Sequence, residues 1–477
     1  MKLYNSATRK IEDFVPFNKN ELKLYTCGPT VYHYAHIGNL RTYIFEDILE
    51  KSLSYLGYNV NRVMNITDVG HLTSDEDTGE DKMLKGAKRE NKSVLDIAKF
   101  YTEAFKRDFE SLKLKWPSVV IPATNCVNTY IEMIEVLLKK GYAYISGDNI
   151  YFDTSKIEEY NPFNNQQKED FKVGVRDTVD EDKHKKNQQD FVLWFTKSKF
   201  ENQELKWNSP WGVGYPGWHI ECSGISYKYL GDYLDIHCGG VDNKFPHHAN
   251  EIAQSEAFFG KKWCRSWFHV EHLNIMNGKM SKSEGNFLTM PSLKEKGYTP
   301  EVYKLFCLQS HYRKVQNFSF ESLDIAKATY SSIIKKISAL SLNDEKIDHE
   351  KVKLFDEQFK EALSNDLNTS LAVTAIFDVL KSDLNDNSKM ELIKRFDNVL
   401  SVSLSEALKK EQTSSIQDNQ ELLNIIKEKV ALRDQAKKNK DYSLADKIRG
   451  ELEEIKVSLV DSSNGVIVYH DGLKINI

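Results

Sequence analysis

The sequence lacks the features that mark several classes of protein. Its 477 residues include only 6 cysteines and 10 prolines, and residues 1–17 lack the apolar core of a signal peptide. No apolar run approaches the roughly 18 residues that cross a membrane. These absences exclude a disulfide scaffold, a proline-rich chain and a membrane-spanning protein. We therefore expect a cytosolic (cytoplasmic) protein with no membrane partner, whose thiols bind a metal or are buried.

The charge balance is close to even. Lys and Arg total 65 against 70 Asp and Glu, a net charge of -5, so any nucleic-acid partner must be bound by local patches. The hydrophobic fraction is 40% and the charged fraction 28%, which is ordinary for a folded protein. At this length we expect about three domains.

The first 67 residues carry the pattern of a β-α-β unit. Residues 21–27 alternate apolar and polar side chains, 40–56 repeat apolar residues at helical spacing, and 59–67 read as a second strand. This crossover predicts a parallel sheet covered by helices, with ligands at the carboxyl ends of its strands.

Three further patterns predict the later organisation. A hairpin over 142–152 indicates an inserted module, followed by a charged mobile loop over 168–190 and the apolar run 191–195, after which we expect the parent sheet to resume. Residues 323–340 predict the first helix of a bundle. The polar run 409–419 predicts a linker before a last helical pair and a strand over 466–469. The acidic segment 75–82 is assigned no chemistry.

The segment from Cys27 to Asn39 lies where the first strand gives way to the first helix. A helix start offers free backbone amides to phosphate, His36 and Asn39 add donors, and Gly38 lets an adenine ring approach closely. A histidine at this position also serves as a plain helix cap, so the segment needs a partner motif.

The partner motif is Lys279-Met280-Ser281-Lys282-Ser283, in which two lysines can reach a triphosphate. The two motifs together are far more specific than either alone. With both, the sequence resembles a class I aminoacyl-tRNA synthetase.

Two stretches between these motifs narrow the resemblance. Residues 215–223 and 245–254 resemble the signature stretches of the cysteinyl-tRNA synthetase family, and 65–68 and 365–369 extend the similarity along essentially the whole chain. The resemblance implies a zinc ion, one per chain, with four ligands: Cys27, Cys222, His247 and Glu251. The residue chemistry is compatible, because His247 and Glu251 share a helical face and all four side chains are zinc donors, although a lone cysteine is more often a small buried residue.

The resemblance also implies the reaction. L-cysteine and ATP, bound with magnesium, give cysteinyl-adenylate and pyrophosphate, and the cysteinyl group then passes to the 3′ end of tRNA(Cys) with the GCA anticodon. The catalytic candidates are His36, Asn39, Lys279 and Lys282. Gly38 and Asp242 join His36, Asn39 and Lys282 in the ATP site, and Thr30 and Trp218 form the cysteine pocket. The enzyme must distinguish cysteine from serine, which differ by one atom, and an apolar pocket separates such close analogues by only about 100-fold. A zinc ion, which prefers thiolate, would select cysteine. We favour a monomer.

The chain departs from the family pattern at four positions. Asn39 replaces a second histidine and keeps a hydrogen-bond donor. Tyr215, Ala249 and Gln188 replace an arginine, a glutamate and a proline, which puts contacts of the pocket rim in doubt but not the metal.

The implied fold class is α/β: a parallel-sheet, Rossmann-like nucleotide-binding catalytic domain with an inserted module, then an all-α helical bundle and a small C-terminal domain. We expect the boundaries as follows: 1–115, first half of the catalytic domain; 116–205, inserted connective module; 206–315, second half, with the zinc site and lysine motif; 316–408, helical bundle on the anticodon side; and 409–477, tRNA-binding domain.

Two other functions remain open. An ATP-dependent cysteine ligase acting on a small amine would use the same adenylating site but would have no use for a C-terminal tRNA-binding domain. That domain is suggested by basic residues, which an exposed helix face explains equally well: Lys427, Lys429, Arg433, Lys437, Lys438 and Lys440. A zinc hydrolase using His247 and Glu251 leaves both nucleotide motifs unexplained and lacks the H-E-x-x-H order.

Overall fold

The computed structural model describes residues 1–69, 83, 86, 90, 93–163, 183–197, 205–275, 287–439, 441–454, 457–462, 465–470 and 473–475, without the side chains of 408–423 and of most residues after 453. The chain forms two compact units. The first comprises Met1–Lys336 and Ser341–Leu404, and the second Ile337–Leu340 with Ser405–Ile477. The predicted acidic segment, the lysine motif and most of the loop over 168–190 lie outside the described residues.

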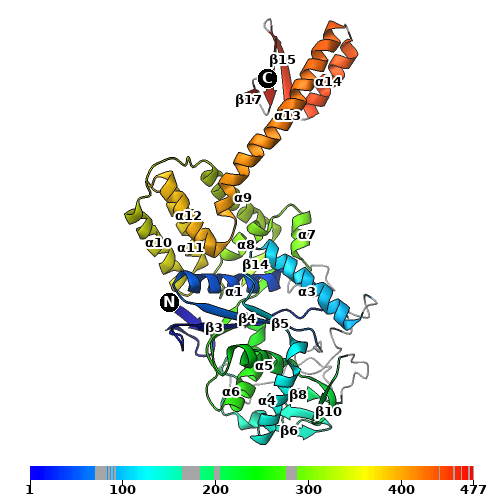
Figure 1. The fold of residues 1–477 in the computed structure, drawn as a ribbon, viewed down its shortest axis with the longest axis vertical. Helices are drawn as coiled ribbons and strands as arrows, with labels where there is room; N and C mark the ends of the chain where they lie inside the picture. Colours follow the sequence, from blue (N-terminus) through cyan, green and yellow to red (C-terminus); the bar gives the residue numbers. More distant parts are fainter. Residues whose placement is uncertain are drawn as a thin grey trace. The chain divides into compact units, whose positions relative to one another are not determined.

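A five-stranded parallel sheet forms the centre of the first unit, as predicted. Its strand order is β12-β11-β3-β4-β5. The strands are β3 (Leu22–Thr26), β4 (Val60–Ile66), β5 (Val119–Pro122), β11 (Leu234–Gly240) and β12 (Cys264–Val270). Helix α1 (Ile37–Tyr55) makes the crossover from β3 to β4, and α3 (Val94–Ser111) precedes β5. Figure 1 shows α1 along one face of this sheet and α5 and α6 on the other.

Helix α1 begins and ends where the sequence signals it. His36 is the N-cap, and Gly57, at a φ of 95°, follows the last turn. The helix is nevertheless buried on more than its apolar side. Arg62 of β4 lies between Glu46 and Glu50, 3.3 Å from each, and burial raises the pKa of Glu46 to about 8 against the pull of Arg62. Arg62 therefore contacts both carboxyl groups and shares Glu50 with Lys115, whose Nζ lies 2.7 Å from the Glu50 Oε1, and the Glu46 carboxyl keeps its proton at neutral pH.

The predicted hairpin belongs to a second, antiparallel sheet with the order β6-β7-β8-β10-β9. Its strands are β6 (Ala143–Ser146), β7 (Asn149–Phe152), β8 (Phe191–Phe195), β9 (Trp207–Ser209) and β10 (Gly212–Pro216). The parent sheet resumes later than expected, at β11, because β9 and β10 first extend the antiparallel sheet. A short buried apolar run such as 191–195 does not reveal which kind of sheet it joins.

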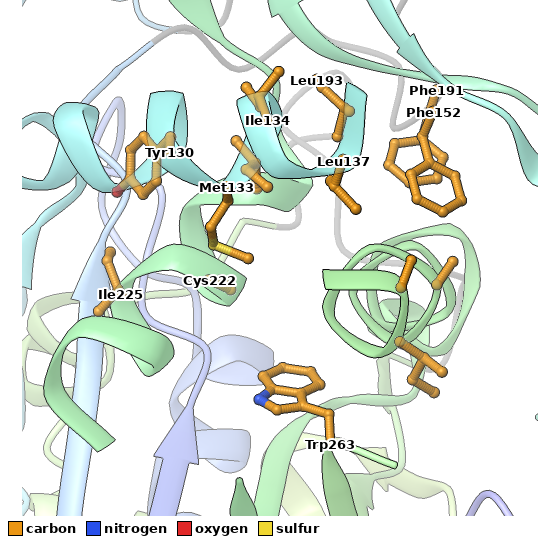
Figure 2. Packing of buried hydrophobic residues seen from close by; sticks show 14 of the residues in the cluster. Tyr130, Met133, Ile134, Leu137, Phe152, Phe191, Leu193, Cys222, Ile225 and Trp263 are labelled. Atoms are coloured by element: carbon orange, nitrogen blue, oxygen red, sulfur yellow. The ribbon is translucent and has the colours of Figure 1, made fainter. Parts of the chain in front are cut away.

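A hydrophobic core joins this second sheet to the helices that carry the site. Figure 2 shows side chains of α4 (Val127–Lys139) facing Cys222 and Ile225 of α5 (Trp218–Leu230), with Trp263 close by. Gly224 permits this approach, since a Cβ there would lie 2.4 Å from the Tyr130 ring. The close contact fixes the position of α5, and with it Cys222.

The chain continues into helices, as predicted, with a short parallel pair at the junction. The pair consists of β13 (Leu273–Ile275) and β14 (Gln316–Phe318). The helices are α7 (Met290–Glu295), α8 (Pro300–Leu308), α9 (Phe320–Ser338), α10 (His349–Ser364), α11 (Thr369–Lys381) and α12 (Asp386–Leu400). A hairpin of β1 (Lys2–Asn5) and β2 (Lys10–Asp13) opens the chain. No helix among the described residues has the length and apolar character of a membrane span.

The second unit corrects one prediction. Residues 409–419 are not a linker but part of α13 (Ala407–Lys438). The run contains no Gly or Pro, and its Lys, Glu and Gln residues favour a helix. Helix α14 (Tyr442–Glu454) packs against α13 around Ile426, Val430, Ile448 and Leu452. An antiparallel sheet of β15 (Val457–Ser462), β16 (Gly465–His470) and β17 (Leu473–Ile475) follows, which confirms the strand expected at 466–469.

Candidate active site and metal centre

The site lies at the carboxyl ends of β3 and β11, where a parallel sheet binds its ligands. Cys27 follows β3 directly, and its amide donates to the carbonyl of Cys238 on β11 at 3.1 Å. Beyond β11, a 3₁₀ turn (Val241–Asn243) and a short π-helical segment (Lys244–His248) lead into α6 (Ala249–Phe259). The end of β3, the turn after β11, the π-helical segment and α6 thus meet at one point.

The structure brings the four predicted zinc ligands together at this point. Cys27, Cys222, His247 and Glu251 each offer one donor atom, and the four atoms lie within 4.8 Å of one another. Cys222, His247 and Glu251 are buried, and Cys27 is half-buried. Within this group, the His247 Nε2 lies 3.1 Å from the Glu251 Oε1. Two sulfurs, one imidazole and one carboxylate in this volume are a donor set for a tetrahedral metal ion.

The electrostatics of the group suit a metal. Burial lowers the pKa of His247 to about 3, so its imidazole is neutral and keeps a lone pair for a ligand. Burial, together with the neighbouring Cys222 thiol, raises the pKa of Cys27 well above its usual range, and burial also raises the pKa of Cys222. The Glu251 Oε1 is buried and accepts no hydrogen bond from the described residues. A divalent cation would satisfy this oxygen and displace the thiol protons.

His247 is held by two neighbours that leave its Nε2 directed at Glu251. Its Nδ1 lies 2.9 Å from the Nδ1 of His219, and the Trp218 ring stacks on its imidazole at a centroid distance of 4.0 Å. Metal-binding histidines commonly have the second ring nitrogen fixed in this way. Trp218, predicted to line the cysteine pocket, therefore lies directly beside the donor group.

Three further histidines surround the donors. The His237 Nε2 lies 2.9 Å from the Glu251 Oε2, the His248 Nε2 lies 3.3 Å from the Cys27 Sγ, and the His248 Nδ1 lies 2.8 Å from the His269 Nε2. None of the three belongs to the ligand set that the family resemblance implies. His237 and His269 occupy inward positions on β11 and β12, and only the register of these strands reveals that they converge.

A second donor set overlaps the first. Cys27, His237, His248 and Glu251 also place one donor atom each within 4.8 Å of one another. Both sets need Cys27 and Glu251, so the two sets cannot each hold an ion at the same time. The two sets differ in their number of thiols, two in the first and one in the second.

The nucleotide motif forms the start of α1. The Asn39 amide donates to the His36 Nδ1 at 3.1 Å, and the His36 amide donates to the Asn39 Oδ1 at 3.2 Å, which is a reciprocal capping box. His36 is therefore a helix cap; it and Gly38 are half-buried, and Asn39 is exposed.

The same helix start contacts the chain just after the lysine motif. The Ile37 amide donates to the Leu288 carbonyl at 2.9 Å, and the Phe287 ring lies 5.6 Å from the His36 ring. Lys279 and Lys282 themselves lie outside the described residues.

The remaining predicted contacts lie around the same strand ends. Asp242 is exposed in the turn after β11, and Thr30 is half-buried and pairs with Thr67 in a parallel bridge. Gly28 allows the closest approach here, because a Cβ would lie 1.6 Å from the Asn65 carbonyl oxygen. The Gly28 amide donates to the Asn65 Oδ1 at 2.8 Å. This contact gives Asn65, the first residue of the stretch 65–68 that carries part of the family resemblance, a structural role next to Cys27.

Two sequence-based expectations need correction. Tyr215 is not at a pocket rim: it is buried in the antiparallel sheet and stacks on Phe195 at 4.9 Å. Arg433, a member of the predicted basic cluster, is only 2% exposed, so its guanidinium is not available to a phosphate. Lys429 forms an ion pair with Glu451.

The basic cluster is therefore smaller than predicted. Of its members, Lys427 and Lys438 are exposed and Lys437 is half-buried. Lys440 lies outside the described residues.

The other two departures from the family pattern differ in their surroundings. Ala249 is buried at the start of α6, and Gln188 is exposed.

Comparisons with known proteins give one consistent result. A family model, the tRNA synthetases class I (C) catalytic domain, matches residues 13–328. A cysteine–tRNA ligase of Treponema denticola is 43% identical over 490 residues, covering 97% of this chain and 98% of the relative. A cysteine–tRNA ligase of Borrelia garinii subsp. bavariensis is 42% identical, covering 98% of this chain and 99% of the relative. The Mycobacterium tuberculosis methionyl-tRNA synthetase in complex with methionyl-adenylate shares the fold, with a TM-score of 0.53, 14% identity, and coverage of 84% of this chain and 93% of that one.

Proposed function

We propose, on the premise that this chain belongs to the cysteine–tRNA ligase family of class I aminoacyl-tRNA synthetases, that it attaches L-cysteine to tRNA(Cys) at the expense of ATP. The observation that carries the proposal is similarity over nearly the whole chain, combined with a Cys/Cys/His/Glu donor group, three of whose members are buried, near the helix start that carries His36. A monomer acting in the cytosol is part of the same proposal.

The first step is an in-line displacement at phosphorus. A cysteine carboxylate oxygen attacks the α-phosphorus of ATP, the bond from that phosphorus to the bridging oxygen breaks, and pyrophosphate leaves; a magnesium ion bound with ATP would offset the charge of the phosphates. The protein contributes position and charge, through the donors of His36 and Asn39 and the cations of Lys279 and Lys282. Gly38 gives room for the adenine ring, and Asp242 can accept hydrogen bonds from the ribose hydroxyls.

The second step transfers the cysteinyl group. A ribose hydroxyl of the terminal adenosine attacks the carbonyl carbon, the ester forms, and AMP leaves with the bonding electron pair while its phosphate takes up the hydroxyl proton. Domain 409–477 supplies tRNA contacts in this proposal, through the exposed Lys427 and Lys438. The remaining domain boundaries, 1–115, 116–205, 206–315 and 316–408, belong to the same proposal.

The metal in this proposal is zinc, held by Cys27, Cys222, His247 and Glu251. When bound, zinc prefers a thiolate to a hydroxyl and so distinguishes cysteine from serine. The chain's own residues orient the substrate around it. Trp218, stacked on His247, forms one wall of the cysteine pocket, and Thr30 lines it at the end of β3.

The test is ATP–pyrophosphate exchange with cysteine and with serine, followed by aminoacylation of a tRNA carrying the GCA anticodon. We expect exchange with cysteine only, and charging of the tRNA. Absence of cysteine-dependent exchange would refute the proposal. Exchange without tRNA charging would favour the small-amine ligase instead.

A further inference from the structure

Arg41 of α1 is a fully buried cation, five residues after the helix cap His36. Its guanidinium donates to backbone carbonyls of three residues, to Glu271 through Nη1 and, through Nη2, to His311 at 3.3 Å and Lys314 at 3.1 Å. Its Nε donates to the Gln316 Oε1 at 3.1 Å. All four acceptors are neutral oxygens, and three of them belong to the backbone, so the Arg41 contacts depend on the position of that backbone.

The four acceptors belong to the two chain segments that form the β13-β14 pair. Glu271 lies two residues before β13, and residues 311–316 lead into β14. The segments are also joined directly, since the Glu271 amide donates to the Tyr312 carbonyl at 2.8 Å and the Gln316 amide to the His272 carbonyl at 3.0 Å. Arg41 therefore fixes the beginning of β13 against α1.

This contact lies on the path to the lysine motif. Described residues on both sides of 276–286 are bound to α1: Glu271 by Arg41, and Leu288 by the Ile37 amide at 2.9 Å. Burying a guanidinium is unfavourable unless its donors are satisfied, so the four hydrogen bonds favour one geometry of the Arg41 side chain.

The helical bundle holds the same segment from the other side. Asp366, between α10 and α11, accepts from the Tyr312 hydroxyl at 2.6 Å, the Arg313 Nε at 2.7 Å and the Tyr4 amide at 2.9 Å. Its backbone has a φ of 55°, in the left-handed region that Asp, like Asn and Gly, adopts more readily than most residues. Asp366 belongs to the stretch 365–369, to which neither of the two proposed reaction steps assigns a role.

We propose that Arg41 is a positioning residue for the adenylation step, and that Asp366 supports it from the bundle. Together they clamp residues 311–316, and so set where β13 lies relative to the His36 end of α1. The inference rests on the proposed function, because it assigns residues to the nucleotide half of that same site.

The test compares full-length variants in cysteine-dependent ATP–pyrophosphate exchange, with rates expressed per active site from the yield of adenylate in a single turnover. In Arg41→Lys we expect kcat to fall by about 10- to 100-fold, as for an ångström-scale misplacement, with the KM for cysteine within about twofold and bound metal unchanged. Asp366→Asn should show the same split with a smaller fall, and serves as the second variant if Arg41→Lys does not fold. Arg395→Lys and Asp383→Asn are matched controls, since these residues form surface ion pairs with Glu391 and Lys351.

The outcomes are distinguishable. A per-site kcat equal to that of the controls in both variants would overturn the inference, as would equal losses in kcat and in affinity for cysteine, which indicate general damage. A wild-type protein with no cysteine-dependent exchange would instead overturn the proposed function.

Discussion

Metal binding by this chain should be strongly linked to pH, and Cys222→Ser should halve that linkage. Burial raises the pKa of both Cys27 and Cys222 above the ordinary thiol value, so both are protonated in the metal-free protein at neutral pH. His247 releases no proton near pH 7, because its pKa is about 3. Zinc bound by the first donor set must therefore displace two thiol protons.

The magnitude follows from this proton count. With two protons displaced, the apparent zinc affinity should rise about 100-fold per pH unit below the thiol pKa values, and with one proton about tenfold. Between about pH 6 and about pH 7.5 the wild type should gain roughly 1000-fold and Cys222→Ser roughly 30-fold. The variant should also bind at least about 100-fold more weakly at pH 7.5, because a hydroxyl is a far poorer ligand than a thiolate.

The assay is a competition titration against a chromophoric zinc chelator at several pH values, with proton release measured by an indicator dye in weak buffer. Cys126→Ser is the matched control, because Cys126 is buried but belongs to neither donor set. A slope near one in the wild type, unchanged in Cys222→Ser, would refute the reasoning. That result would assign the metal to the second donor set, which contains only the Cys27 thiol.

Three further predictions concern other parts of the chain. Lys282→Ala should lower the rate of cysteine activation by about 100-fold or more at unchanged metal content; a changed KM for ATP at normal kcat would contradict this role. Neutralising Lys427 and Lys438 should weaken tRNA charging and lower the salt dependence of tRNA binding by about one unit of slope per lysine, while pyrophosphate exchange stays normal; equal charging would move tRNA recognition elsewhere. The Glu46 carboxyl releases its proton above about pH 4.5 in the unfolded chain but keeps it up to about pH 8 in the folded chain. The wild-type protein therefore loses stability as the pH rises, and Glu46→Gln should abolish this pH dependence. Wild-type stability should thus fall relative to the variant by roughly 2 kcal/mol between about pH 6 and about pH 8 in urea unfolding, and parallel curves would count against the buried proton.

Local patterns predicted the elements on which the site is built. The β3-α1-β4 unit follows from alternation, helical spacing and Gly57, and its topology locates ligands at the strand ends. A cap at His36 was one of the sequence-based interpretations, but its reciprocal pairing with Asn39 was not predicted, because His and Asn lie outside the usual S/T-x-x-E/Q pattern of a capping box. The four donors were identified by family resemblance, and their convergence depends on three elements that are distant along the chain.

Other features escaped sequence reasoning because they depend on what packs against an element. The run 409–419 is polar, yet polarity does not distinguish a linker from a helix when Gly and Pro are absent. Arg433 belongs to a basic cluster in the sequence, but helical geometry turns it inward while Lys427 and Lys438 stay exposed. Charge counts describe a segment, whereas phosphate contact requires an exposed face.

Helix α1 illustrates the general limit. Its apolar periodicity predicts one buried side, yet Arg41, Glu46, Asp47 and Glu50 are buried too. Their partners lie on elements that the periodicity of α1 does not encode, such as Gln316 after α8, which is 275 positions from Arg41. A charged residue inside a helix signals exposure only if nothing covers that face. When a sheet covers one side and later helices the other, the same residue becomes a fixed hydrogen-bond donor or acceptor in the core. In this chain such residues join the His36 end of α1 to segments far along the sequence, so variants of these residues test whether distant motifs act together in one function.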